Sequence, residues 1–211
     1  MKRNLLLTMA LICAVMAYAK QSKGEKVDSI KTLQLQNVEV ISTRATKTTP
    51  IAYKNFDKKQ IQSVNFGQDI PFILSLTPSV TVTSDAGNGI GYTTIRVRGT
   101  DPSRINITAN GIPMNDAESS NVFWVNMGDF ASSVQSMQIQ RGVGTSTNGS
   151  GAFGATINMQ TENIGTQPYA GIDMSAGSYY SHKETFRFGT GLIDGHWGFQ
   201  GRLSNIGSKD I

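Results

Sequence analysis

The clearest chemical signature in this chain is a run of glycines at residues 149–154, which fits the pattern G-x-G-x-x-G. In a dinucleotide-binding protein this loop leads directly into a helix, and an acidic residue follows about 20 residues later. Here residues 156–159 are typical of a strand, and Glu162 comes too early in the chain. We therefore interpret these glycines as sites of tight backbone turns, which the absence of a Cβ permits.

Catalytic and metal-binding constellations are not evident in the sequence. The two histidines, His182 and His196, lie in strand-like segments, and no nucleophile–base pair or metal-ligand spacing is visible. The single cysteine, Cys13, lies in a segment that we expect to be removed, so the mature chain has no disulfide. Basic residues outnumber acidic ones by 19 to 15, but no basic stripe with interleaved aromatic residues indicates nucleic acid. We predict a protein that is not an enzyme, with no metal, no cofactor and no nucleic-acid partner.

The N-terminus has the pattern of a secretory signal peptide, expected to comprise residues 1–19. Lys2 and Arg3 precede an apolar run over residues 4–15, and residues 17–19 read Ala-Tyr-Ala, a small-x-small cleavage site. The apolar run is shorter than the ~20 residues of a membrane-spanning helix, which disfavours an anchor. We predict cleavage after this segment and export from the cytoplasm.

Residues 20–45 read as a linker that contains one short extended stretch. Residues 20–33 are polar with little periodicity, whereas residues 37–42 read Asn-Val-Glu-Val-Ile-Ser. Such a stretch can add as a strand to the sheet of a partner protein, with backbone hydrogen bonds providing the affinity. The alternative is an ordinary first strand of the domain that follows.

Residues 46–161 have the pattern of a compact α+β domain. We expect Asp57 to cap a short helix, and a second helix to cover residues 70–76. Asp129 is expected to cap a further short helix, and Asn110-Gly111 is the strongest turn signal. Strand-like runs occupy residues 80–83, 94–98, 104–109, 134–140 and 156–160.

The C-terminal part of the chain, residues 168–211, has long alternating strands. Residues 169–177, 182–192 and 196–204 place apolar and polar side chains on opposite faces, with a tight turn at residues 193–195. Runs of about nine to eleven such residues are typical of transmembrane β-strands, although a soluble antiparallel sheet alternates in the same way. Three strands cannot close a barrel, because an open edge in lipid leaves backbone groups unpaired. We therefore expect the first strands of a barrel that is incomplete in this chain.

Ordered motifs in the second half of the α+β domain carry a family resemblance. Strands end in Arg-Gly at Arg98 and Arg141, residues 105–113 turn on Asn-Gly, and residues 148–158 are a glycine loop that runs into a strand. In this order and spacing the motifs resemble the plug domain of TonB-dependent outer-membrane receptors, over about residues 35–161. The resemblance implies an α+β plug with a mixed four-stranded-type sheet and short helices. The first antiparallel strands of a transmembrane β-barrel would follow it.

The resemblance also implies roles for single residues. Arg98 and Arg141 are expected to lock the plug to the barrel, since a guanidinium can pair with carboxylates of the barrel wall. A solvated arginine at a strand end is the alternative for both. The coupling segment, the TonB box of the family, would be Val38, Glu39, Val40 and Ile41.

Three stretches that lack strand patterning, residues 84–92, 100–103 and 115–126, are expected to form apical loops that face the ligand. Two aromatic residues within them, Phe123 and Trp124, either pack on the ligand or belong to the core. The candidate ligand-facing residues are Asn88, Tyr92, Asp101, Arg104, Asn115, Phe123 and Trp124.

The implied function is energised import across the outer membrane of a Gram-negative bacterium. The expected partners are TonB, energised by ExbB and ExbD, outer-membrane lipid and a ligand such as an iron–siderophore or cobalamin-like complex. The sequence leaves the ligand open. Two other functional classes are alternatives. One is a barrel-less periplasmic binding or interaction module from a truncated gene. The other is a secreted enzyme, which the missing catalytic residues disfavour.

Overall fold

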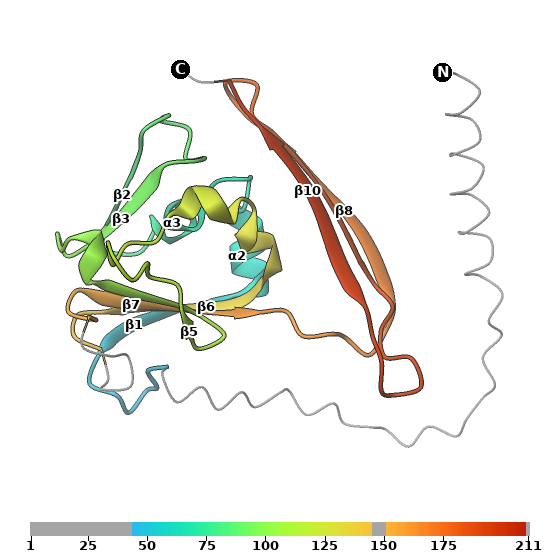
Figure 1. Ribbon diagram of the computed structural model, residues 1–211, viewed down its shortest axis with the longest axis horizontal. Coiled ribbons are helices and arrows are strands. Elements are labelled where there is room, and N and C mark those ends of the chain that lie inside the picture. Colours follow the sequence, from blue (N-terminus) through green and yellow to red (C-terminus); the bar gives the residue numbers. More distant parts are fainter. Residues whose placement is uncertain (1–43, 145–150, 210–211) are drawn as a thin grey trace. The chain divides into compact units, whose positions relative to one another are not determined.

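The computed structural model describes residues 44–144 and 151–209 (Figure 1). The expected signal peptide and the expected coupling segment at Val38, Glu39, Val40 and Ile41 lie outside the described residues. Within the described ranges, no helix is long and apolar enough to cross a lipid bilayer. The described residues form a mixed sheet with short helices, a two-stranded hairpin and a separate three-stranded sheet.

A five-stranded sheet with the order β1-β6-β7-β4-β5 is the centre of the N-terminal domain. β4 and β7 run parallel, and the other neighbouring strands run antiparallel. Since β5 is a two-residue edge strand, the sheet is a mixed sheet of the expected four-stranded type with one short addition, which confirms the α+β fold. Its strands are β1 (Ala52–Asp57), β4 (Ile105–Ala109), β5 (Ile112–Pro113), β6 (Val134–Arg141) and β7 (Ala155–Thr161).

The central strands β6 and β7 are buried on both faces, with a different chemistry on each. Met137, Ile139 and Ile157 point into the hydrophobic core. On the other face the buried amide of Gln138 donates to the carbonyl of Ala45 at 2.9 Å and accepts from its N–H at 2.7 Å. These paired bonds satisfy a buried polar side chain. They also hold the peptide that follows the expected coupling segment against the sheet.

Short helices cover the apolar face of this sheet, as Figure 1 shows. α2 (Lys58–Val64) begins at a capping box: Gln60 N–H donates to the Asp57 carboxylate at 2.8 Å, and Asp57 N–H donates to the Gln60 side chain at 3.0 Å. The predicted cap at Asp57 is thus confirmed. α3 (Ile70–Leu74) has Pro71 in its first turn and ends two residues before the predicted boundary.

A hairpin of β2 (Val80–Ser84) and β3 (Thr93–Val97) forms a separate two-stranded sheet. Ile95 and Val97 are buried in the domain core, which fixes the base of the hairpin. Its tip is the first predicted apical loop. Single 3₁₀ turns complete the domain: η1 (Pro102–Arg104), η2 (Trp124–Met127) and η3 (Phe130–Ser133).

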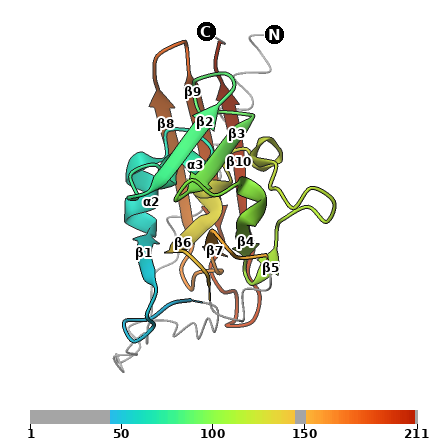
Figure 2. The same ribbon diagram turned by 90° about the vertical axis from the view of Figure 1, so that its left-hand side faces the viewer.

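The C-terminal strands form a three-stranded antiparallel sheet in the order β10-β9-β8 (Figure 2). Its strands are β8 (Tyr169–Ala176), β9 (His182–Gly189) and β10 (Gln200–Gly207). The prediction of a strand over residues 196–204 was wrong at its start, because Ile193 and Trp197 form an isolated bridge around a turn. Asp194 and Gly195 both have positive φ in this turn, 51° and 72°.

Candidate functional site

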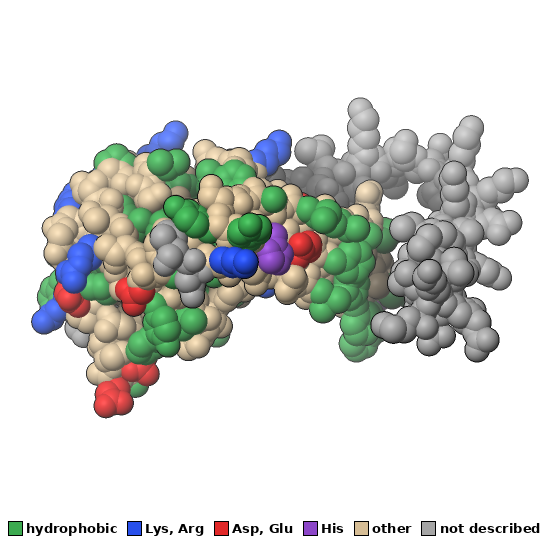
Figure 3. All heavy atoms as spheres, turned by 90° about the horizontal axis from the view of Figure 1, so that it is seen from above, with side chains coloured by type: hydrophobic (Ala, Val, Ile, Leu, Met, Phe, Trp, Pro, Cys, Tyr) green, Lys and Arg blue, Asp and Glu red, His purple; other side chains and the backbone are tan. Residues whose placement is uncertain are grey.

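The three-stranded sheet has one polar and one apolar face. On β9, Lys183 and Thr185 are buried, whereas Phe186 and Phe188 on the opposite face are exposed. Figure 3 shows a continuous group of hydrophobic side chains at the right of the described part of the chain, besides smaller groups elsewhere on this face. An apolar face of this size requires an apolar environment or a partner. Its most exposed members on the strands are Ile172 at 70%, Met174 at 75% and Leu203 at 69%.

The polar face meets the N-terminal domain at the carboxylate of Asp129, which is 2% exposed. The Lys183 ammonium lies 2.7 Å from Oδ1, and the Arg202 guanidinium lies 2.6 Å from Oδ2. Thr185 donates to Oδ2 at 3.0 Å, and the hydroxyls of Ser132 and Ser204 also donate to the carboxylate. We call Asp129, Ser132, Lys183, Thr185, Arg202 and Ser204 the Asp129 cluster.

The charge of Asp129 is strongly favoured in this setting. Burial alone would raise the pKa of the carboxyl, but hydrogen bonds from Lys183, Ser132 and Ser204 and the charge of Lys183 outweigh it and lower the pKa to about 2. A lowered pKa in the folded state means that the contribution to stability is present above the unfolded pKa of 3.8. It is lost only as the pH falls through about 2, so the cluster is intact at neutral pH.

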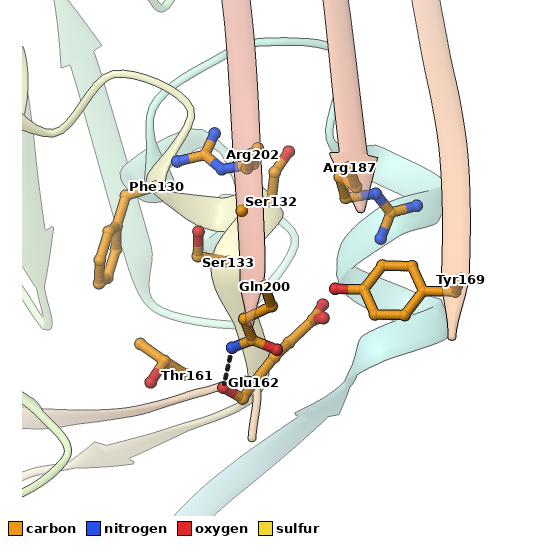
Figure 4. A pocket seen from close by; sticks show the side chains of 10 residues that line it. Phe130, Ser132, Ser133, Thr161, Glu162, Tyr169, Arg187, Gln200 and Arg202 are labelled. Atoms are coloured by element: carbon orange, nitrogen blue, oxygen red, sulfur yellow. Dashed lines mark hydrogen bonds between the residues drawn. The ribbon is translucent and has the colours of Figure 1, made fainter. Parts of the chain in front are cut away.

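Two cavities of about 440 and 500 Å³ lie between the N-terminal domain and the three-stranded sheet, and Ser132 and Arg202 of the cluster line the smaller one. Tyr169, Arg187 and Glu162 line both, and in Figure 4 the Tyr169 side chain points from β8 towards Glu162. Gln200 donates to the Glu162 carbonyl at 3.0 Å, and the Lys58 ammonium lies 2.7 Å from the Glu162 carboxylate. The lining is polar enough for water to fill this space.

Comparison with known proteins identifies the N-terminal domain. The family model of the TonB-dependent Receptor Plug Domain matches residues 45–156, slightly more than half of the chain. The chain belongs to this family. It is a family of receptors rather than a class of enzyme, and residues 45–156 of the fold described above are its plug.

Solved receptor structures share this fold at low sequence identity. The ferric yersiniabactin uptake receptor of Yersinia pestis is 16% identical, with a TM-score of 0.56 over 73% of this chain and 24% of the receptor. The siderophore receptor PirA of Acinetobacter baumannii is 19% identical, with a TM-score of 0.54 over 73% of this chain and 24% of the receptor. The alcaligin receptor FauA of Bordetella pertussis is 18% identical, with a TM-score of 0.55 over 76% of this chain and 27% of the receptor. This chain therefore spans about a quarter of the length of the receptors that it matches.

The two arginines expected to lock plug to barrel lie near each other on the plug. Arg141 donates to the carbonyl of Pro78 at 3.2 Å, and a Cβ at Gly142 would lie 3.0 Å from the Arg98 guanidinium. Arg98 itself is exposed and has a positive φ of 54°. Neither arginine belongs to an ion pair within the described ranges, so their locking role stays a prediction. The ion pairs that join the described part of the plug to β8–β10 are made instead by Asp129.

Four of the predicted ligand-facing residues meet in one groove of about 280 Å³ on the plug: Tyr92, Asp101, Phe123 and Trp124. Tyr92 and Phe123 are 66% and 49% exposed at its surface. Trp124 is 3% exposed and packs in the hydrophobic core, so its contact with a ligand stays a prediction. Trp124 is the first residue of η2 and its buried member.

The three remaining candidates have structural partners. The Asn115 side chain accepts from Ile107 N–H and donates to the carbonyls of Ile105 and Ser120, so it shapes its loop. Arg104 lies over the Phe153 ring at 5.7 Å. Asn88 donates to the Ser208 hydroxyl at 2.7 Å, which connects the hairpin tip to the chain just after β10. Their contact with a ligand stays a prediction.

A buried carboxyl that the sequence analysis missed lies beneath the hairpin tip. Asp69 is 5% exposed, accepts from the Thr93 hydroxyl at 2.8 Å, and donates its N–H to the Gly89 carbonyl at 2.8 Å. Burial raises the pKa of Asp69 to about 6, against the opposing hydrogen bonds from Thr93 and Gly91. Asp69 directly precedes α3, where an aspartate is an ordinary helix cap. The sequence therefore gave no signal that this carboxyl is buried.

The plug is therefore expected to lose stability as the pH rises from 3.8 to about 6, the unfolded and folded pKa values of Asp69. The folded state binds this proton more tightly than the unfolded chain, so its contribution is largest below 3.8 and declines as the pH rises to about 6. Urea unfolding at several pH values should show this slope, and Asp69→Asn should remove it. An unchanged slope in the variant would assign the effect to other groups.

Proposed function

We propose that this chain is the N-terminal part of a TonB-dependent outer-membrane receptor that imports a large and scarce nutrient. The observation that carries the proposal is a plug fold attached to a two-faced sheet, which turns polar residues to the plug and apolar residues away from it. That arrangement suits the wall of a barrel that encloses a plug. Residues 168–211 would then begin the barrel, whose apolar face contacts outer-membrane lipid.

An iron–siderophore complex is the first candidate for the ligand, and a cobalamin-like complex is the second. The structurally similar proteins include the ferric yersiniabactin, ferric enterobactin and alcaligin receptors, which supports a metal chelate. In this proposal the groove lined by Tyr92, Asp101 and Phe123 contributes to the ligand surface. Arg98 and Arg141 would pair with carboxylates on barrel strands beyond this chain.

Energy would reach the plug through the coupling segment. A signal peptide at residues 1–19 directs export, and the segment within residues 20–45 adds to a strand of TonB, which ExbB and ExbD energise. The paired hydrogen bonds between Gln138 and Ala45 support this route, because they connect the peptide after the segment directly to the central strand of the plug, residues 46–161. No cofactor is required.

A periplasmic module without a barrel is less favoured. It would leave Ile172, Met174 and Leu203 in water at exposures near 70%. Each large apolar side chain loses roughly 1.5–3 kcal/mol of burial when it stays in water. Fractionation tests the choice: recovery in the outer membrane supports the receptor, and recovery solely in the soluble periplasm contradicts it.

Replacement of Val40 by proline in the complete receptor tests the coupling step. Proline removes a backbone donor and disrupts strand addition, so we expect uptake to fall at least about tenfold while ligand binding is retained. Uptake of a radiolabelled ferric siderophore and its binding to whole cells are the two measurements. Ser22→Pro, in the linker, is the matched control and should import normally. Normal uptake by the Val40→Pro variant would refute our placement of the coupling segment.

A further inference from the structure

The Asp129 cluster gathers its charged and polar groups around one buried carboxylate. One carboxylate receives two cations and three hydroxyl groups, and the Arg202 guanidinium also donates to the Asp129 backbone carbonyl at 2.8 Å. Lys183 is 4% exposed. Without the carboxylate, the buried Lys183 and the 23% exposed Arg202 would lose their counter-charge, which is more costly than loss of a surface ion pair.

The cluster joins elements that are distant in the sequence. Arg202 lies 73 residues and Thr185 lies 56 residues beyond Asp129. Lys183 and Thr185 come from β9, and Arg202 and Ser204 come from β10. On the plug, Asp129 directly precedes η3 (Phe130–Ser133), which leads into the central strand β6. One side chain therefore connects the middle of the plug sheet to two neighbouring strands of the wall.

The other polar contacts across this boundary are weaker in kind. Ser175 donates to the Phe66 carbonyl at 3.2 Å, and Asn88 and Gln200 make the single neutral bonds given above. A hydrogen bond to a charged group is about twice as strong as a bond between neutral groups. Within the described ranges, both ion pairs that cross from plug to sheet end on Asp129.

We propose that Asp129 is the positioning residue that anchors the plug to the first strands of the barrel wall, through Lys183 and Arg202. The role of the three-stranded sheet as a barrel wall rests on the proposed receptor function. The docking of plug and sheet through Asp129 can be measured without that function. The anchor has the opposite polarity to the pairing expected of Arg98 and Arg141, because here the plug supplies the anion and the wall supplies the cations.

The test is a distance measurement on the 211-residue chain in detergent micelles that cover the apolar face of the sheet. Spin labels on cysteines at Thr81 of the plug and Met174 of β8, both exposed, report docking in a Cys13→Ser background. Increasing urea gives the ratio of docked to undocked molecules. With Asp129→Asn we expect this ratio to fall by a factor on the order of 10², because the buried Lys183 and the partly buried Arg202 lose their counter-charge.

Two further variants make the result specific. Adding Lys183→Met and Arg202→Met to Asp129→Asn removes the stranded cations, and we expect docking to recover. Asp173→Asn removes a 52% exposed carboxylate that pairs with Arg187 on the same sheet and should leave the ratio unchanged within about twofold. Unchanged docking in Asp129→Asn, or equal loss in Asp173→Asn, would overturn the anchor. Failure of the triple variant to recover would show that loss of shape, rather than stranded charge, is responsible. No transport is measured, so a failed uptake experiment leaves this result unaffected.

Discussion

An arginine in place of Ile172 is expected to keep the complete receptor out of the outer membrane. Ile172 is the fourth of eight residues in β8 and is 70% exposed on the apolar face. If that face contacts lipid, a charge near the middle of the bilayer costs about 2–4 kcal/mol of barrel stability. In a soluble sheet the same position would accept arginine at almost no cost. Heat-modifiable mobility of the folded barrel and fractionation of the outer membrane are the measurements.

Two control variants separate charge from loss of the side chain. Ile172→Ala removes the apolar side chain without adding charge and should assemble nearly normally. Thr81→Arg adds the same charge at an exposed position of β2 on the plug and should have little effect. If Ile172→Arg assembles as well as Thr81→Arg does, β8 does not face lipid, and the barrel assignment of this sheet is wrong.

A Cβ at Gly154 is expected to destabilise the plug by about 1–3 kcal/mol, because it overfills a packed site. The added atom would lie 2.1 Å from the Thr100 hydroxyl oxygen and 2.8 Å from the Thr100 Cβ. A change of rotamer moves the hydroxyl but not the Cβ. The backbone cannot easily yield, since Gly154 N–H donates to Arg104 at 2.9 Å and its carbonyl accepts from Gly142 at 2.8 Å.

Urea unfolding of Gly154→Ala measures this effect, followed by the fluorescence of Trp124. Trp124 is 3% exposed and Trp197 is 73% exposed, so a Trp197→Phe background leaves one buried reporter. Gly151→Ala is the matched control within the same glycine loop, because a Cβ there meets no atom within 4 Å. Thr100→Gly should restore part of the stability lost by Gly154→Ala. Equal effects of the two alanine variants would show that the close approach to Thr100 is unimportant.

The glycine loop was recognised from the sequence, but the reason for one of its glycines is found only in the structure. The sequence pattern excluded a dinucleotide site, because the residues that follow are typical of a strand, and β7 (Ala155–Thr161) lies there. The pattern did not single out Gly154 from its neighbours. Its requirement for glycine comes from Thr100, more than 50 residues earlier in the chain, which the fold places against it.

Local features of this protein were determined by the sequence alone, because their partners lie within a few residues. The Asp57–Gln60 capping box, the Asn110-Gly111 turn and the alternation of β8 and β9 follow from spacings of three, one and two residues. The ordered motifs were sufficient to predict the plug family and its α+β fold. Each of these features is readable without knowledge of the remainder of the chain.

Only the tertiary structure decided which distant segments meet. β1 was not predicted, because its polar sequence becomes a strand through pairing with β6, so that Ala52 lies opposite Arg141. Trp124 could be assigned to the core only when its surroundings were known, and Asp129 was expected to be a helix cap. Its carboxylate instead binds Lys183 and Arg202, because folding brings a desolvated anion beside two cations far along the chain. Long-range electrostatic pairing leaves no periodic trace in a sequence, and here it connects the plug to the three-stranded sheet.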